Sequence, residues 1–200
     1  AVVRSGVDVI SPACPLAWEG IVEVPDRYHH PARPEYERVS ASAPVFEVLL
    51  REMADRGTIL DPTLAMHSRL EGGPAEGGGP APAGPPAVCD RTFARDVVRR
   101  AHELGVPVAA GTDFSTPPNE PPALFLELEA LVAHAGLTPL DAIEAATRTA
   151  AASMGLQDRV GTLQSGTALT FVLLDQDPTA DIGNLLSVRE VWKNAVRYRR

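Results

Sequence analysis

Apolar positions in the first third of the chain form two short runs separated by one stretch with helical spacing. The runs are Val7 to Ile10 and Thr58 to Leu64. Between them, "APVFEVLLREMADRG" places Val45, Leu49 and Met53 four residues apart, which puts them on one face of a helix. The stretch ends on a glycine, as helices commonly do. The pattern predicts a strand, a helix and a second strand.

A further helix and a third strand follow a segment of low complexity. Residues 71–87 contain six glycines and five prolines. Such a segment buries too little apolar surface to offset the entropy cost of ordering, so we expect a mobile loop there. The sequence "DRTFARDVVRRAHELG" then has Phe93, Val97 and Leu104 on one helical face, and the third apolar run extends from Val106 to Gly111.

The last part of the chain predicts two helices and a β tail. Leucines recur on one face of residues 123–137, and Thr138 and Asp141 have the spacing of a helix capping box. From Val160 onward, "VGTL", "ALTFVLLD" and "EVWKNAVRY" predict short strands and turns.

The order of these elements predicts an α/β fold. Repeating strand–helix units imply parallel strands with right-handed crossovers. Three units do not close a barrel, so they form either a small open sheet or the last part of a larger fold. We expect an α/β part over residues 1–157 and a β part over residues 158–200.

Composition and charge disfavour nucleic acids and membranes as binding partners. The net charge of −8 disfavours binding to a phosphate backbone, and no apolar run reaches the roughly 18 residues of a membrane span. Cys14 and Cys89 lack the spacing of a zinc or redox motif. The chain opens without an initiator methionine or a signal peptide, which leaves the compartment undetermined.

The third apolar run ends in a carboxylate, within "GVPVAAGTDF". Asp113 could cap a helix, but the next residues, "STPPNEPP", hold four prolines and cannot begin a helix at once. We therefore place Asp113 at the mouth of a strand, facing a loop. The strand mouths of α/β proteins are where these folds usually carry their chemistry.

This stretch, together with "ELEALVAHAGLTPLDAIEAATRTAAASMGL" and the β tail, resembles the C-terminal part of metal-dependent amidohydrolases. The nearest branch is that of imidazolonepropionase and the prolidase-like enzymes. The resemblance implies a (β/α)₈ barrel that carries one or two divalent ions, zinc or a similar metal, beside a β-sandwich built from both chain ends. The three apolar runs would be the sixth, seventh and eighth barrel strands, and the earlier strands would be absent.

The resemblance assigns roles to individual residues. Asp113 matches the aspartate after the eighth strand, where a carboxylate can ligate the metal and carry a proton from the attacking water to the leaving nitrogen. Phe114 adjoins it and would lie near the substrate. His67 follows the seventh strand and would also face the substrate, the alternative being a solvated loop residue.

Several positions depart from the family pattern. Pro12 stands where the sixth strand usually ends in a metal-binding histidine, and proline has no donor atom for a metal. Lys193 lies in the β tail, so it cannot be the bridging lysine of the family, and Leu169-Thr170 replaces a usual Ala-Asp. Ala195 replaces the glycine of a Lys-Asn-Gly hairpin, where a positive φ would cost about 1 kcal/mol. These departures indicate a divergent or decaying copy.

The other histidines offer weaker candidates for metal binding. His102 and His134 fall near helix C-termini, where the helix dipole favours them at the surface. His29 and His30 lie in the loop after the first strand and could replace the missing ligand only by folding back.

Other catalytic arrangements have little support. Glu127 and Glu129 point to different sides of a helix, so we expect a solvated face there. Ser115 has no nearby histidine and no Gly-x-Ser-x-Gly elbow, and the glycine-rich region lacks the Lys-Ser/Thr of a phosphate loop.

The resemblance therefore predicts part of a metal-dependent hydrolase of C–N bonds in cyclic amides or Xaa-Pro dipeptides. Its partner would be a small-molecule substrate, with no nucleic acid or membrane, and a homo-oligomer is compatible with the sequence. We expect this chain alone to be inactive. The alternative is a non-catalytic barrel relative that binds a small molecule or a partner, which Pro12 favours. The β tail argues against a third hypothesis, a free-standing three-stranded module.

Overall fold

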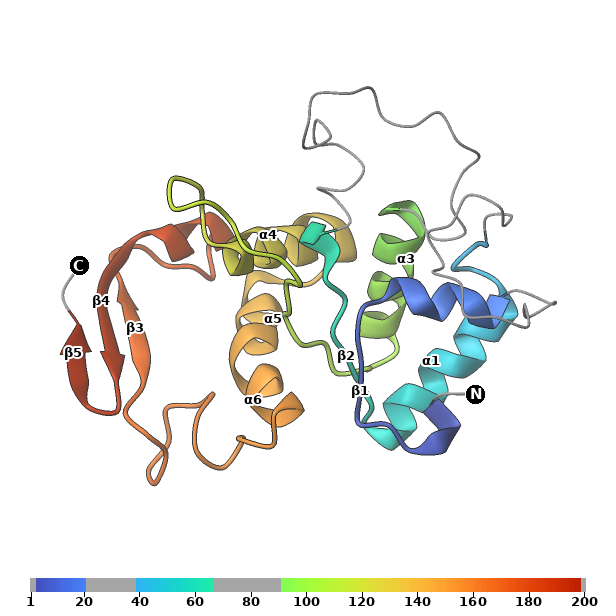
Figure 1. Cartoon of the computed structure of the whole chain (residues 1–200), viewed down its shortest axis with the longest axis horizontal. Helices are drawn as coiled ribbons and strands as arrows, with labels where there is room; N and C mark the ends of the chain where they lie inside the picture. The colour runs from blue at the N-terminus through green and yellow to red at the C-terminus, as the bar shows by residue number, and fades with distance from the viewer. Residues whose placement is uncertain (1–2, 21–38, 67–90, 199–200) are drawn as a thin grey trace.

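The computed structural model describes residues 3–20, 39–66 and 91–198. The predicted loop 71–87 and the candidates His29, His30 and His67 lie outside these ranges. Helices and short parallel strands fill the N-terminal part, and an antiparallel sheet forms the C-terminal part (Figure 1). The strands are β1 (Val9–Ile10), β2 (Ile59–Leu60), β3 (Phe171–Leu174), β4 (Val188–Lys193) and β5 (Val196–Tyr198). The α-helices are α1 (Pro44–Arg56), α3 (Arg91–Glu103), α4 (Ala123–Ala135), α5 (Pro139–Glu144) and α6 (Ala150–Ser153).

Four shorter helical segments and the helical residues 64–66 also lie within the described ranges. A π-helical segment, Ala145–Thr149, joins α5 to α6. The others are 3₁₀ helices: Val3–Ser5, Cys14–Gly20 and Ile182–Leu186. No helix in the described ranges has the length and apolar character needed to traverse a bilayer.

The first two apolar runs pair in parallel, as the sequence predicts. Val9 lies opposite Ile59, and Ile10 lies opposite Leu60. The third run joins through a single parallel bridge between Leu60 and Val108. The α/β class and the order of the runs are therefore confirmed.

The strands are shorter than predicted. The run Thr58–Leu64 contributes only Ile59–Leu60 as strand, because Pro62 has no amide to donate and Thr63 turns the chain with a φ of 52°. The run Val106–Gly111 pairs only at Val108 among the described residues.

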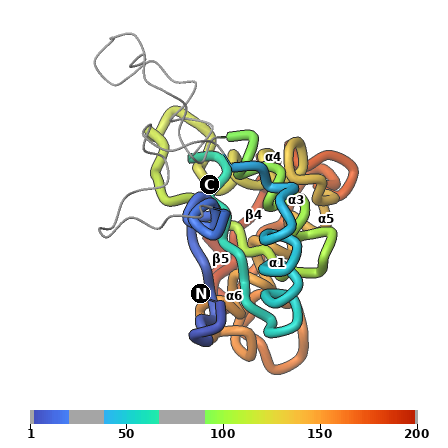
Figure 2. The backbone as a smooth tube through the Cα atoms, turned by 90° about the vertical axis from the view of Figure 1, so that its right-hand side faces the viewer, coloured from blue at the N-terminus to red at the C-terminus, as the bar shows by residue number. Residues whose placement is uncertain are grey.

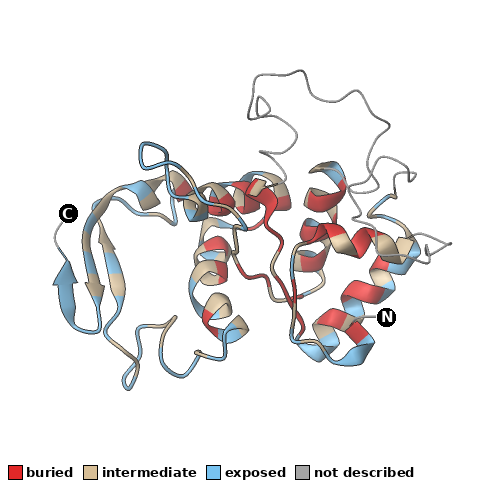
Figure 3. Cartoon of the chain, in the orientation of Figure 1, coloured by how far each residue is buried: buried red, intermediate tan, exposed pale blue. Residues whose placement is uncertain are grey.

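Helices α1 and α3 pack side by side in both views (Figures 1 and 2). The rings of Phe46 and Phe93 meet edge to face with their centroids 5.2 Å apart. The predicted face of α1 is buried at Leu49 and Met53, with Phe46 and Leu50 buried beside them, but Val45 at its start is 39% exposed. Gly57 ends α1 with a φ of 69°. Buried residues concentrate on the parallel strands, α1, α3 and α4 (Figure 3).

The predicted long helix after Thr138 is interrupted. Its start agrees with the prediction: the Thr138 hydroxyl accepts from the Asp141 amide, and the Asp141 carboxylate accepts from the Thr138 amide. The π-helical segment then begins at Ala145, whose carbonyl oxygen accepts the Ala110 amide at 3.1 Å. An amide of the third run thus occupies a helical carbonyl at the residue where the departure from α-helical bonding begins.

The C-terminal sheet is antiparallel in the order β3-β4-β5, with the rings of Phe171 and Trp192 stacked 5.8 Å apart. The stretch "VGTL", residues 160–163, forms no strand, because 160–162 are bends and Leu163 is irregular. Asn194 and Ala195 make the tight β4–β5 turn with φ values of 51° and 63°, and this confirms the expected strain at Ala195.

Replacing Ala195 by glycine should relieve that strain. We expect Ala195→Gly to raise the free energy of unfolding by about 1 kcal/mol, measured on the full-length protein by denaturant unfolding. The matched control is Ala133→Gly on the exposed side of α4, which should lower stability by a similar amount. An Ala195→Gly variant no more stable than its parent would contradict the account of the turn.

Candidate functional site at the strand ends

The segments that leave the parallel strands meet at one edge. The Asp61 amide donates to the Ile10 carbonyl at 2.9 Å, and the Ala109 amide donates to the Leu60 carbonyl at 2.9 Å. Beyond the strands, the Ala13 amide donates to the Pro62 carbonyl at 3.3 Å. Residues at the ends of the paired strands are therefore held together by main-chain hydrogen bonds.

Asp113 lies on this edge with its side chain exposed. Its φ of 54° is left-handed, a conformation that aspartate tolerates better than most residues. The Thr112 hydroxyl donates to the Phe114 carbonyl at 3.1 Å and braces the turn. Helix α4 begins only at Ala123, with Pro122 as its N-cap, so Asp113 is not a helix cap. Phe114 follows it and is half-buried.

Asp61 is a second carboxylate at this edge, and the sequence analysis missed it. Its Oδ1 accepts the Gly111 amide at 2.8 Å. Burial raises the pKa of the Asp61 carboxyl, hydrogen bonds from the Ser11 side chain and the Gly111 amide act in the opposite direction, and the charge of Asp113 raises it further. Like Asp113, Asp61 is a carboxylate close after a paired strand, since β2 ends at Leu60.

The prediction that Glu127 lies on a solvated face is wrong. Its side chain is 0% exposed within α4, and its two oxygens accept the amides of Leu64 and Ala65 at 2.9 and 2.7 Å. Glu129 is exposed, as predicted. The two side chains do point to different sides of the helix, but the side of Glu127 faces the core. Burial raises the pKa of Glu127 to about 7, against the lowering effect of its two amide hydrogen bonds.

Thr63 lies between Asp61 and the two residues whose amides bind Glu127, and both its backbone conformation and its buried hydroxyl are unfavourable. It is 1% exposed, and its hydroxyl has no hydrogen-bond partner among the described residues. A β-branched residue at a φ of 52° is a genuine outlier, and such strain costs on the order of 1–3 kcal/mol. Hydrogen bonds flank this turn on both sides: Asp61 before it accepts the Gly111 amide, and Leu64 after it donates its amide to Glu127.

The other candidates contribute little to the edge. Pro12 follows β1 there, as predicted, and offers no donor atom for a metal. Cys14 is 1% exposed and disulfide-bonded, so it has no free thiol. His102 and His134 lie in the last turns of α3 and α4, as predicted, and Lys193 is exposed at the end of β4.

Among the described side chains at this edge, that of Asp113 is the best candidate for a metal ligand. The carboxylate of Asp113 is exposed at the strand edge and offers oxygen donors that zinc and similar ions accept. No group of three His, Cys, Asp or Glu side chains comes together to hold a metal in the described ranges. Any complete site would need ligands beyond them.

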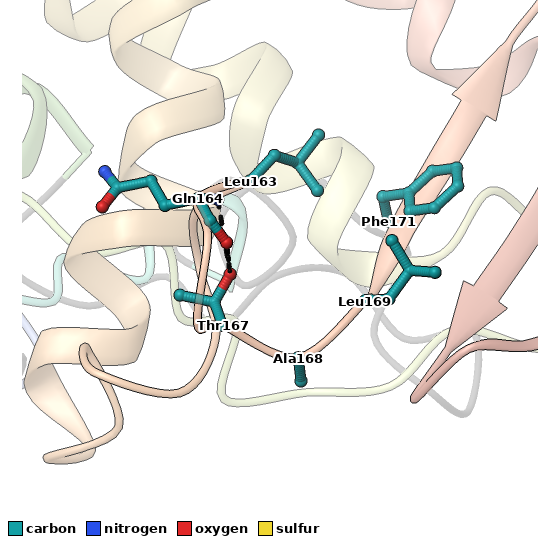
Figure 4. Close-up of a pocket in the computed structure, with 6 residues that line it drawn as sticks. All are labelled: Leu163, Gln164, Thr167, Ala168, Leu169 and Phe171. Carbon is teal, nitrogen blue, oxygen red and sulfur yellow. Dashed lines mark hydrogen bonds between the residues drawn. The ribbon is translucent and has the colours of Figure 1, made fainter.

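A hollow of about 370 Å³ lies elsewhere, between the loop 163–169 and β3 (Figure 4). Its lining is mostly apolar, and the Thr167 hydroxyl is hydrogen-bonded to the Gln164 carbonyl at 2.9 Å. None of the lining residues is a charged group or a histidine. The hollow therefore lacks the groups that hydrolysis requires. The residues that line it are Leu163, Gln164, Thr167, Ala168, Leu169 and Phe171.

A family profile and individual relatives both connect this chain to amidohydrolases. The profile described as "Amidohydrolase family" matches residues 90–197, more than half of the chain. Ochratoxinase of Aspergillus niger is 40% identical over 97 residues, which cover 46% of this chain and 19% of that protein. Imidazolonepropionase of Ralstonia nicotianae is 34% identical over 109 residues, which cover 54% of this chain and 27% of that protein.

Solved structures agree over a larger part of the chain. A Xaa-Pro dipeptidase with bound methionine in its active site superposes with a TM-score of 0.63 and 25% identity, covering 76% of this chain and 37% of that one. The ochratoxinase of A. niger gives a TM-score of 0.62 and 26% identity, covering 79% and 35%. The chain thus matches about a fifth to a quarter of these curated relatives and little more than a third of the solved chains.

The raised pKa of Glu127 predicts a specific pH dependence of stability. The folded state binds this proton more tightly than the unfolded state, so the stabilisation is full below pH 4.5 and is lost as pH rises through about 7. In the parent, this group should lower the free energy of unfolding by up to about 3 kcal/mol over that range.

Glu127→Gln should remove this part of the slope, measured by denaturant unfolding at a series of pH values. Glu129→Gln, on the exposed side of the same helix, is the matched control and should leave the slope as it is. Equal slopes for Glu127→Gln and the parent would show that Glu127 does not titrate as its burial requires.

Proposed function

The chain belongs to the amidohydrolase family, and from this premise we propose that it is the C-terminal part of a metal-dependent hydrolase of C–N bonds. In this proposal β1, β2 and the run Val106–Gly111 are the last three strands of a (β/α)₈ barrel. Residues 158–200 contribute the C-terminal strands of a β-sandwich. The observation that carries the proposal is the exposed Asp113 carboxylate at the end of the third parallel run, within the segment matched by the family profile.

Asp113 has two roles in this proposal. Its carboxylate would hold a divalent cation, zinc or a similar ion, which when bound supplies Lewis-acid polarisation of the scissile carbonyl. The same carboxylate accepts a proton from the attacking water and delivers it to the leaving nitrogen as the C–N bond breaks. Its exposure leaves it free for both roles.

The substrate class follows from the relatives. Imidazolonepropionase, ochratoxinase and a Xaa-Pro dipeptidase are among them, and we propose a small molecule with a cyclic amide or an Xaa-Pro dipeptide bond. Phe114 adjoins Asp113 and would contact this substrate. His67 is proposed for the same role from its position in the sequence, since it lies outside the described residues.

A second candidate function rests on Pro12. The segment after β1 reaches the strand edge without a side chain that can bind a metal. This favours a barrel relative that binds a small molecule or a protein partner without catalysis. The two candidates differ in whether the protein binds a metal at the strand ends and turns over a substrate.

Replacing Asp113 tests the role of its carboxylate. Asp113→Asn should lower kcat/KM by at least about a hundredfold, because general acid–base catalysis alone contributes a factor of about 10² to 10⁴. The measurement is hydrolysis of a panel of cyclic amides and Xaa-Pro dipeptides by the full-length protein. Asp158→Asn, at an exposed position in a turn, is the control and should be neutral. Unchanged hydrolysis by Asp113→Asn would refute the assignment.

Replacing Pro12 tests the register of the first run. Pro12→His should raise the zinc content of the full-length protein, measured by elemental analysis, because imidazole is a good zinc donor. If the parent already holds a full complement of zinc and Pro12→His changes nothing, this position is not the missing ligand. His29 or His30 would then be the next candidates.

A further inference from the structure

Asp61 makes more connections at the strand edge than its sequence position suggests. Its amide donates to the Ile10 carbonyl at 2.9 Å, so its main chain continues the pairing with β1. Its carboxylate accepts from the Ser11 side chain and from the Gly111 amide. One residue of the second run therefore joins the segment that follows the first run to the last residue of the third.

The contact with Gly111 is close on both carboxylate oxygens. A Cβ built at Gly111 would lie 2.3 Å from Oδ1 and 2.3 Å from Oδ2 of Asp61, far inside any permitted contact. The carboxylate of Asp61 thus covers the face of Gly111 that a side chain would need. Position 111 requires glycine because of Asp61 rather than because of its own backbone angles, which are not left-handed.

Gly111 is also the last fixed point before Asp113. The Ala110 amide is held by the Ala145 carbonyl at 3.1 Å, and the Gly111 amide by Asp61 at 2.8 Å. The chain then turns through Thr112 into the left-handed conformation of Asp113. The direction in which the Asp113 carboxylate leaves the strand edge is therefore set at Gly111.

We propose that Asp61 is a positioning residue for Asp113, acting through the Gly111 amide. The inference rests on the proposed function, in which Asp113 is the metal ligand and proton acceptor. Asp61 need not touch the substrate. Its oxygens are engaged by Gly111 and Ser11, and losing them would let the turn that carries Asp113 move by the small distances that catalysis does not tolerate.

The hydrogen bond is tested first, without any need for activity. In the full-length protein labelled with [15N]glycine, exchange of the Gly111 amide should speed up by at least about tenfold in Asp61→Ala. It should stay near the parent's rate in Asp61→Asn, which keeps an oxygen acceptor.

Gly111→Ala should be strongly destabilised. The double variant Asp61→Ala/Gly111→Ala should recover much of that loss, because the carboxylate that the new Cβ would strike is gone.

Kinetics then separate positioning from a direct role. Asp61→Ala should lower kcat by about 10- to 100-fold with KM changed by less than about threefold, while Asp61→Asn should keep most of kcat. Asp158→Ala, which removes an exposed carboxylate in a turn, is the control for lost charge.

Three results would overturn the inference. The first is an unchanged Gly111 amide in Asp61→Ala, and the second is an unchanged kcat in that variant. The third is an Asp61→Asn variant as impaired as Asp61→Ala with its Gly111 amide intact, which would make the charge of Asp61 act directly. If the parent hydrolyses no substrate, the proposed function fails, while the amide exchange and the double variant still decide whether Asp61 fixes the turn.

Discussion

The hydrogen bond from the Gly111 amide to the Asp61 carboxylate is the constraint on which the strand edge depends. Main-chain amides that leave a strand must find acceptors when they are shielded from water. The Ala110 and Gly111 amides have no further strand to pair with among the described residues. They take the Ala145 carbonyl and the Asp61 carboxylate instead. The bond to the Ala145 carbonyl accompanies a π-helical segment, and the bond to the Asp61 carboxylate requires glycine at position 111.

Two energetically unfavourable features, at Glu127 and Thr63, lie on the other side of Asp61. Glu127 is a carboxyl group in the core, where burial destabilises it unless it is hydrogen-bonded. Thr63 is strained, and its buried hydroxyl has no hydrogen-bond partner within residues 3–20, 39–66 and 91–198. The two features occupy neighbouring positions, because Glu127 accepts the amides directly after Thr63. Strained residues and buried polar groups tend to collect where a protein carries its function. Glu127 lies near enough to Asp61 for the Asp61 charge to raise its pKa, so both features adjoin the turn that Asp61 begins.

The sequence predicted the order of elements because the apolar spacing and the capping residues are local signals. Gly57, the Thr138 capping box and the turn at Ala195 depend on a few neighbouring residues, and each was found from them. Asp113 was found because a carboxylate directly after an apolar run is conspicuous.

What the sequence could not give depends on contacts between distant segments. The π-helical segment begins at Ala145, whose carbonyl accepts the amide of Ala110, 35 positions earlier in the chain. Glu127 is buried against amides 62 and 63 positions away, while helical spacing alone says only that it points away from Glu129. Asp61 was hidden because the apolar run continues past it to Leu64, although the strand itself ends at Leu60.

The central claim is that Asp113 holds a metal at the ends of these strands. Anomalous diffraction at the zinc absorption edge, from crystals of the full-length protein grown with zinc, tests it most directly. The account predicts a peak about 2.0–2.2 Å from a carboxylate oxygen of Asp113. A zinc ion bound by other residues, with Asp113 outside its coordination sphere, would contradict the account, and so would the absence of any peak at the strand ends.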